Sequence, residues 1–124
     1  MNKLMLGLRT TIYKVEDLNK AKEWYSKAFQ INPYFDEPFY VGYNINGYEL
    51  GLVPNEVLEK KSDNVLSYWG VSDIETEFNR LIELGASVHQ KPTNVGGNII
   101  VASVKDIWEN VIGIIYNPEF KLEK

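Results

Sequence analysis

Few residues in this sequence could carry chemistry, and Glu49 is the most prominent of them. Cysteine is absent and His89 is the only histidine, which excludes thiol catalysis, iron–sulfur clusters and an assignable Ser-His-Asp arrangement. Glu49 lies in an apolar segment, Tyr48–Val53, directly after Asn46-Gly47. It is either a carboxylate in a binding site, acting as a general base or pairing with a cation, or a solvated glutamate beside a turn. If Glu49 is buried, desolvation should raise its pKa.

The charge and composition of the chain limit the kinds of partner that we expect it to bind. The net charge is −4 and no Lys/Arg cluster is longer than Lys60-Lys61, so we expect no nucleic-acid partner. No apolar run approaches the length of a membrane span and no signal peptide is recognisable, so we expect no membrane association and a cytoplasmic location. A chain of 124 residues, 44% of them hydrophobic, is long enough for one domain with its own core.

The elements that must position Glu49 are recognisable in the first half of the chain. Leu6–Val15 is rich in β-branched and aromatic residues and predicts a strand. Asp17 is a suitable N-cap for a helix over Leu18–Phe29, in which apolar residues recur at helical spacing. Phe39–Ile45 and Tyr48–Val53 predict a hairpin, because the Asn-Gly pair between them favours a two-residue turn.

The second half repeats this order. Val65–Val71 predicts a strand, Asp73 caps a helix that ends near Gly85, and Ala86–His89 is compatible with a short strand. Two further strands are predicted at Asn98–Val104 and Val111–Tyr116, joined by a long hairpin loop at Lys105–Asn110. We expect a linker at Pro54–Asn64 and a mobile loop without phosphate-binding features at Asn94–Asn98.

The two halves align as an internal repeat. A shift of 56 residues places Val15–Leu18 on Val71–Ile74, and a shift of 62 places Leu50–Val53 on Ile112–Ile115. A unit present only twice indicates duplication within one domain, because solenoids need three or more units. We therefore predict an α+β fold with modules at about 4–55 and 63–118; the alternative is two unrelated strand–helix–hairpin units.

Two motifs resemble those of a known superfamily. Thr10–Leu18, followed by Trp24-Tyr25, is similar to the opening of each half in the vicinal-oxygen-chelate superfamily of glyoxalases, bleomycin-resistance proteins and dioxygenases. Asp106–Gly113 keeps the Asp and the Asn of that superfamily's Asp-Pro-x-Gly-Asn turn. The resemblance implies two tandem βαβββ modules that form a curved, cup-like mixed sheet, with the helices outside and the ligand in the cup.

The resemblance also implies where a metal would bind. The four ligand positions of metal-dependent members correspond to Thr10, Leu66, Glu49 and Gly113; an alternative alignment places Gly51, not Glu49, opposite Gly113. Leucine and glycine side chains cannot bind a cation, and one carboxylate with one hydroxyl is a poor site. We therefore expect no metal and no other cofactor.

Strand alternation around these positions predicts an apolar cup with a few polar groups. The expected ligand-binding residues are Thr10, Ile12, Tyr43, Glu49, Leu66, Tyr68, Ser103, Trp108 and Gly113. Trp108 is predicted at a loop tip, as a lid over the cup or as a contact in a dimer. The alternative is that these residues only fill a closed core.

Three functions remain open at this point. The first is a protein that binds an apolar or aromatic small molecule without chemistry, as in the bleomycin-resistance branch. The second is a lactoylglutathione-lyase-like lyase, an isomerase or a dioxygenase that uses Glu49 as base or residual metal ligand. The third is a regulatory or interaction module with a filled cup. By analogy with the superfamily we expect a homodimer.

Overall fold

The structure is a computed structural model that describes residues 8–56, 61 and 65–120. The chain divides into two compact units, residues 1–58 and 59–124, and each is described by itself. In the described part of the chain, no helix is long and apolar enough to cross a membrane.

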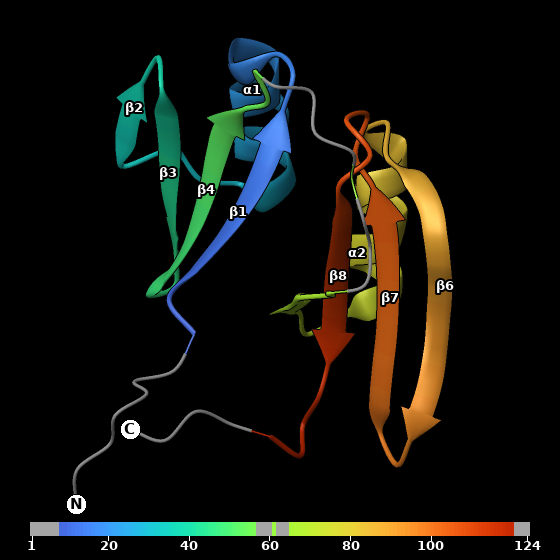
Figure 1. The fold of residues 1–124 in the computed structure, drawn as a ribbon. Coiled ribbons are helices and arrows are strands. Elements are labelled where there is room, and N and C mark those ends of the chain that lie inside the picture. The colour runs from blue at the N-terminus through green and yellow to red at the C-terminus, as the bar shows by residue number, and fades with distance from the viewer. Residues whose placement is uncertain (1–7, 57–60, 62–64, 121–124) are drawn as a thin grey trace, which may run out of the picture. The chain divides into compact units, whose positions relative to one another are not determined.

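Module 1 has the element order βαβββ (Figure 1). Its elements are β1 (Thr10–Val15), α1 (Leu18–Phe29), β2 (Phe35–Glu37), β3 (Tyr40–Ile45) and β4 (Tyr48–Pro54). The strands form one mixed sheet in the order β1-β4-β3-β2, in which β1 runs parallel to β4 and the other pairs are antiparallel. The first and last strands of the module are therefore neighbours, and Glu49 on β4 lies between two strands.

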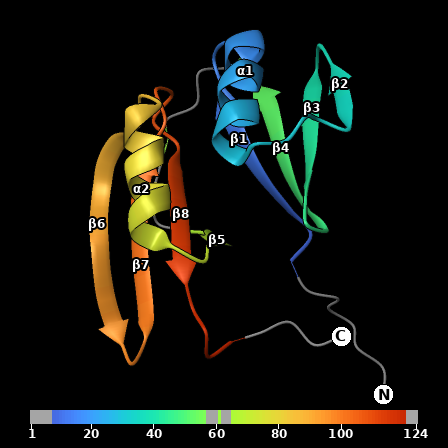
Figure 2. The same cartoon turned by 180° about the vertical axis from the view of Figure 1, so that it is seen from behind.

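Helix α1 covers one face of this sheet (Figure 2). It begins after Asp17, whose side chain accepts a hydrogen bond from the Lys20 backbone N–H at 3.1 Å, which satisfies one of the unpaired donors of the first turn. Its buried residues include Ala21 and Tyr25, and the Tyr25 ring stacks on Tyr13 of β1. The apolar stripe of the helix therefore packs on the sheet and forms the core of module 1.

Module 2 repeats the arrangement (Figure 2). Its elements are β5 (Tyr68–Gly70), α2 (Ile74–Glu83), β6 (Ser87–Gly96), β7 (Ile99–Lys105) and β8 (Val111–Tyr116). The sheet order is β5-β8-β7-β6, again with a parallel pair between the first and last strands. Asp73 caps α2 by accepting from the Thr76 backbone N–H at 3.2 Å, and Phe78 and Leu81 bury the inner face of that helix.

The predicted α+β class, the two βαβββ modules and both capping aspartates are confirmed. One strand was not located and two details were wrong. The βαβββ order implies β2, but the sequence did not show its position, since three exposed residues carry no pattern. β5 covers only part of Val65–Val71. Asn94–Gly96 is not a loop, because it completes the ten-residue β6, with a turn at Gly97.

Two expectations remain predictions: that residues 1–124 form a single domain, and that the two sheets form a joint cup. Most of the expected linker, residues 57–60 and 62–64, lies outside the described residues.

Candidate functional site

Glu49 projects from the face of the module 1 sheet opposite α1, which we call the far face. Its strand neighbour Leu50 is fully buried on the helix side, and successive side chains of a strand point to opposite faces. Thr10 is the register partner of Glu49 across the parallel β1–β4 pair. The Thr10 hydroxyl donates a hydrogen bond to Glu49 Oε1 at 2.9 Å. The repeat thus brings two of the predicted site residues into direct contact.

Two tyrosines complete the surroundings of the Glu49 carboxylate. The Tyr34 hydroxyl donates a hydrogen bond to Oε2. The Tyr40 hydroxyl lies near the carboxylate and interacts with it electrostatically. With Thr10, two neutral hydroxyl donors from different segments bind one carboxylate, and a third hydroxyl lies beside them. Such donors stabilise the ionised form.

The pKa values follow from this arrangement. Hydrogen bonding by Tyr34 lowers the pKa of Glu49, and the smaller opposing effect of desolvation does not reverse it. The raised pKa was expected only for a buried Glu49, and that condition is not met, because Glu49 is half-buried and its oxygens are hydrogen-bonded. Desolvation, followed by the interaction with Glu49, raises the pKa of Tyr40 to about 12, and the hydrogen bond to Glu49 raises that of Tyr34.

Two glycines form the floor on which the tyrosine rings lie. Gly42 of β3 and Gly51 of β4 are cross-strand partners on the far face. A Cβ on Gly42 would be 3.0 Å from Glu49 Oε2 and 3.0 Å from the Tyr40 ring. A Cβ on Gly51 would be 2.3 Å from the Tyr40 hydroxyl oxygen. Both positions must therefore lack a side chain for Tyr40 to reach Glu49 across the sheet.

Exposed aromatic rings continue from this floor. The Phe35 ring lies 6.5 Å from Tyr34, 6.0 Å from Phe39 and 6.0 Å from Tyr40, measured between ring centroids. Tyr34 is 64% exposed, Phe39 66% and Phe35 38%. Exposed apolar rings that cluster in this way are uncommon on a protein without a partner or ligand for them. We call Tyr34, Phe35, Phe39 and Tyr40 the aromatic cluster.

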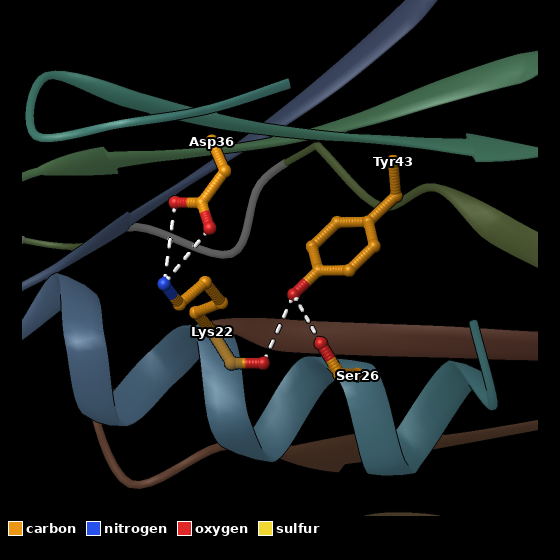
Figure 3. A network of polar contacts seen from close by, with 4 residues as sticks. All are labelled: Lys22, Ser26, Asp36 and Tyr43. Carbon is orange, nitrogen blue, oxygen red and sulfur yellow. Dashed lines mark hydrogen bonds and ion pairs between the residues drawn. The ribbon is translucent and has the colours of Figure 1, made fainter. Parts of the chain in front are cut away.

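Two other predicted residues of module 1 lie on opposite faces. Ile12 lies on the far face and contacts the Gly51 position, where its Cδ1 would be 2.7 Å from an added Cβ. Tyr43 does not line that face. Its hydroxyl lies 3.0 Å from Ser26 Oγ and donates to the Lys22 carbonyl of α1, so the ring lies between sheet and helix (Figure 3). The assignment of Tyr43 to the ligand surface was wrong by one strand position.

The network around Tyr43 has a structural role. Lys22 of α1 forms an ion pair with Asp36 of β2 at 2.9 Å, beside the Tyr43 hydrogen bonds (Figure 3). These contacts attach the edge strand β2 to the helix, and β2 follows Tyr34 directly in the chain. The network therefore helps to position the aromatic cluster, although it does not touch Glu49.

Module 2 resolves the ambiguity in the alignment of the two halves. Ile12 pairs with Gly51 in module 1, and Tyr68 pairs with Gly113 in module 2, so Gly113 corresponds to Gly51. The counterpart of Glu49 is then Val111, and the mapping of Glu49 onto Gly113 was wrong by two residues. Tyr68 lies over Gly113, whose added Cβ would be 2.8 Å from the Tyr68 ring.

The remaining predicted residues of module 2 lie apart from any carboxylate of this kind. Leu66 precedes β5 and is half-buried. Ser103 is fully buried, and its hydroxyl lies 2.7 Å from His89 Nδ1, a contact that the sequence did not indicate. The β6–β7 register is irregular between Val88 and Gln90, on either side of this histidine.

Trp108 does not lie at an exposed loop tip, because it is only 7% exposed, and its roles as a lid or a dimer contact stay predictions. The Asp106 carboxylate accepts hydrogen bonds from the backbone N–H groups of Trp108 and Asn110 at 2.9 and 2.8 Å, and from Asn110 Nδ2 at 3.0 Å. The loop is therefore folded around Asp106, and the two residues kept from the superfamily turn hold it together. Glu109 occupies the glycine position of that turn with φ 69°.

The donors around Glu49 do not fit a divalent metal. One carboxylate and the neutral hydroxyls around it offer no second anionic or imidazole ligand. The counterparts in module 2, Leu66 and Val111, have no donor atom in their side chains. Among the described residues, no group of three or more His, Cys, Asp or Glu could hold a metal ion. A hollow of about 450 Å³ lined by Glu16, Asp17, Asp36 and other residues does not include Glu49.

The sequence missed Tyr34, Tyr40 and Gly42. All three belong to Tyr34–Gly42, in which four aromatic residues occur within seven positions around Asp-Glu-Pro. That density of aromatic residues before a hairpin was the available signal. Their contact with Glu49 depends on how the short β2 returns to β3, which no periodicity indicates.

Comparisons with known proteins agree with this architecture. The Glyoxalase/Bleomycin resistance protein/Dioxygenase superfamily model matches residues 7–114. No curated protein sequence matches the chain significantly. Among solved structures, the hypothetical protein SA1046 of S. aureus is 22% identical with a TM-score of 0.72, covering 93% of this chain and 96% of its own.

Two further solved structures share the fold. A glyoxalase-related enzyme from Fulvimarina pelagi is 16% identical, with a TM-score of 0.76 and coverage of 96% of this chain and 94% of its own. The fosfomycin resistance protein FosX of Listeria monocytogenes is 15% identical, with a TM-score of 0.76 and coverage of 94% and 97%. With the family match over most of its length and the duplicated βαβββ modules, this chain belongs to the Glyoxalase/Bleomycin resistance protein/Dioxygenase superfamily.

Proposed function

We propose that this protein binds an apolar or aromatic small molecule on the far face of module 1, without a resident metal and without chemistry on its ligand. The observation that supports this most directly is the aromatic cluster beside the hydroxyl-bound Glu49. Binding sites are mostly apolar and aromatic, with a few placed polar groups. The far face has this composition: rings, a glycine floor and a single carboxylate.

Exposure of the rings supports binding rather than a purely structural role. Tyr34 and Phe39 leave about two thirds of their side-chain surface in water, 64% and 66% respectively. Covering such rings with a ligand removes apolar area from water, which is favourable by about 25 cal/mol per Å². A planar ligand stacked beside Phe35 would recover this free energy.

Thermal-shift screening of the purified chain against aromatic and amphipathic compounds tests the proposal. A ligand at ten times its Kd stabilises the folded protein by about 1.4 kcal/mol, which raises Tm by a few degrees in a domain of this size. A hit should lose its shift in Phe35→Ala and keep it in Ile107→Ala, a control at an exposed apolar residue of the other module. If no compound shifts Tm at high micromolar concentration, the binding proposal fails.

A second candidate is a superfamily enzyme, a lyase, isomerase or dioxygenase, in which Glu49 accepts or relays a proton. The hydrogen bond from Tyr34 to Glu49 favours it, since it would carry a proton between the ring hydroxyl and the carboxylate. The lowered pKa of Glu49 opposes it, because a carboxylate with bound donors is a weak base. Turnover that survives Glu49→Gln would exclude this role.

We further propose a cytoplasmic homodimer that binds neither nucleic acid nor membrane. The net charge of −4 supports the absence of a nucleic-acid partner. Sedimentation velocity measures the mass: a species of twice 14.3 kDa supports the dimer, and a single species of 14.3 kDa at all concentrations contradicts it.

A further inference from the structure

Both oxygens of the Glu49 carboxylate already accept hydrogen bonds, but its charge is not neutralised. A carboxylate has about four lone-pair sites. Thr10 donates to Oε1 and Tyr34 to Oε2, and the Tyr40 hydroxyl lies beside them. These hydroxyls are neutral, and the ion pairs among the described residues do not include Glu49. The site therefore presents a negative charge that attracts a cation, while each oxygen has only part of its accepting capacity left for N–H or O–H donors.

The rings beside this charge supply the second half of a recognition site for an organic cation. The faces of aromatic rings carry negative potential and attract cations within about 6 Å of the ring centroid. Phe35 joins Tyr34 and Tyr40 into one cluster at 6.5 and 6.0 Å, next to the carboxylate that both hydroxyls reach. Glu37, the register partner of Tyr40 across β2 and β3, adds a second negative charge beside the rings.

We propose that the far face of module 1 binds an alkylated ammonium ion, tertiary or quaternary, through the charge of Glu49 and the rings of the aromatic cluster. This inference rests on the proposed function and names the ligand class for that site. Methyl groups on nitrogen pack on ring faces and need no acceptor atoms, which matches a carboxylate whose oxygens are already hydrogen-bonded.

Other ligand classes match the site less well. A primary ammonium has three N–H donors, and the Glu49 oxygens, each already bound by Thr10 or Tyr34, cannot accept all of them without displacing a hydroxyl. An anion would be repelled by Glu49 and Glu37. A neutral aromatic ligand would pack on the aromatic cluster but gain nothing from the charge of Glu49. We therefore expect the site to bind a quaternary ammonium most tightly, its neutral isostere less tightly and a primary amine least tightly.

Three probes with the same hydroxyethyl group test this order: choline, its neutral isostere 3,3-dimethylbutan-1-ol, and ethanolamine, the primary ammonium. Binding is followed by NMR through the amide signals of Gly42 and Gly51, which lie on the floor of the site. We expect choline to bind at least about fivefold more tightly than the other two, the difference that a cation–π contact with an adjacent charge supplies. Benzyltrimethylammonium should bind more tightly still, because its ring adds apolar contact.

Two variants separate the effect of the charge of Glu49 on binding from the effect of the size of its side chain. Glu49→Gln keeps the size of the side chain and should weaken choline binding about fivefold or more while leaving 3,3-dimethylbutan-1-ol unaffected. Glu83→Gln, on the exposed face of α2 in module 2, changes the net charge equally and should change nothing. The folded state of both variants is checked by circular dichroism.

The outcomes of these experiments distinguish the proposed ammonium ligand from the more general proposal that the far face binds a small molecule. Equal affinities for choline and its neutral isostere, or choline binding that is unchanged in Glu49→Gln, overturn the ammonium ligand but leave small-molecule binding intact. Absence of any shift with both quaternary probes also overturns it. If the broad aromatic panel fails as well, the proposed function falls with it.

Discussion

Replacing Gly51 by alanine tests the glycine floor directly. The new Cβ would lie 2.3 Å from the Tyr40 hydroxyl oxygen and 2.8 Å from its ring, closer than non-bonded atoms approach, so Tyr40 must move. Ile12 Cδ1, at 2.7 Å, lies at the end of a flexible side chain and can rotate away at little cost. Displacement of Tyr40 removes the interaction of its hydroxyl with Glu49 and the contact of its ring with Phe35.

The expected cost follows from the contacts that are lost. A hydrogen bond to a charged group contributes about 1.5–3 kcal/mol, and forced repacking costs about 1–3 kcal/mol. Because Tyr40 is half-buried, we expect roughly 1–3 kcal/mol of destabilisation for Gly51→Ala. Gly70→Ala is the matched control: it is also a strand glycine, but no atom lies within 4 Å of an added Cβ there. That change should be neutral or stabilising by about 0.5 kcal/mol.

Urea unfolding, followed by circular dichroism, measures both variants. A double-mutant cycle with Tyr40→Ala isolates the steric term, since Gly51→Ala should cost about 1 kcal/mol less once the ring is gone. Isotope-labelled tyrosine NMR gives a second readout: the pKa of Tyr40, about 12 in the parent, should fall toward its ordinary value of 10.0 in Gly51→Ala. Equal effects of the two glycine substitutions, or strictly additive costs in the cycle, would refute the reasoning.

Further predictions concern the turn of module 2 and the pH dependence. Glu109→Gly should stabilise by about 1 kcal/mol in urea unfolding, because a non-glycine residue at φ 69° is strained; no gain over Glu109→Gln would contradict this. Asp106→Ala leaves three donors without their acceptor and should cost about 2–4 kcal/mol, against a smaller loss for Asn110→Ala. Glu49 has a folded-state pKa below its ordinary 4.5, so the stability it contributes is complete above pH 4.5 and is lost as pH falls through the lower folded value. Urea titrations between pH 3 and 6 should therefore show a weaker acid loss in Glu49→Gln; identical slopes would count against the hydroxyl-bound carboxylate.

Much of the fold could be predicted because the relevant signals are local. Asp17 and Asp73 cap helices through side chains that reach only three residues along the chain. Asn46-Gly47 defines a hairpin through the positive φ values of these two residues, 52° and 94°. The resemblance implied that Thr10 and Glu49 belong to one site, and the parallel pairing of β1 with β4 places them side by side.

The site was only partly predictable, because its decisive contacts are neither local nor periodic. Tyr34, which precedes β2, and Tyr40, at the start of β3, both lie over Gly42, and the ring of Tyr40 extends over Gly51 toward Glu49. These positions depend on glycine in both β3 and β4. Tyr43 was assigned to the wrong face because an error of one position in a strand reverses the direction of every side chain. Trp108 was misjudged because the buried hydrogen bonds of Asp106 compensate for the missing Pro and Gly of the turn.

The parallel pairing of β1 with β4 has a consequence for synthesis of the chain. Thr10 and Glu49 are 39 residues apart, and every strand partner of module 1 lies between Thr10 and Pro54. As the chain leaves the ribosome, β1 has no partner until β4 has emerged, so closure of that loop delays the sheet. The sheet of module 1 can complete its hydrogen bonding before β5 is synthesised. Although β1 is synthesised first, it is the last strand of the module to pair.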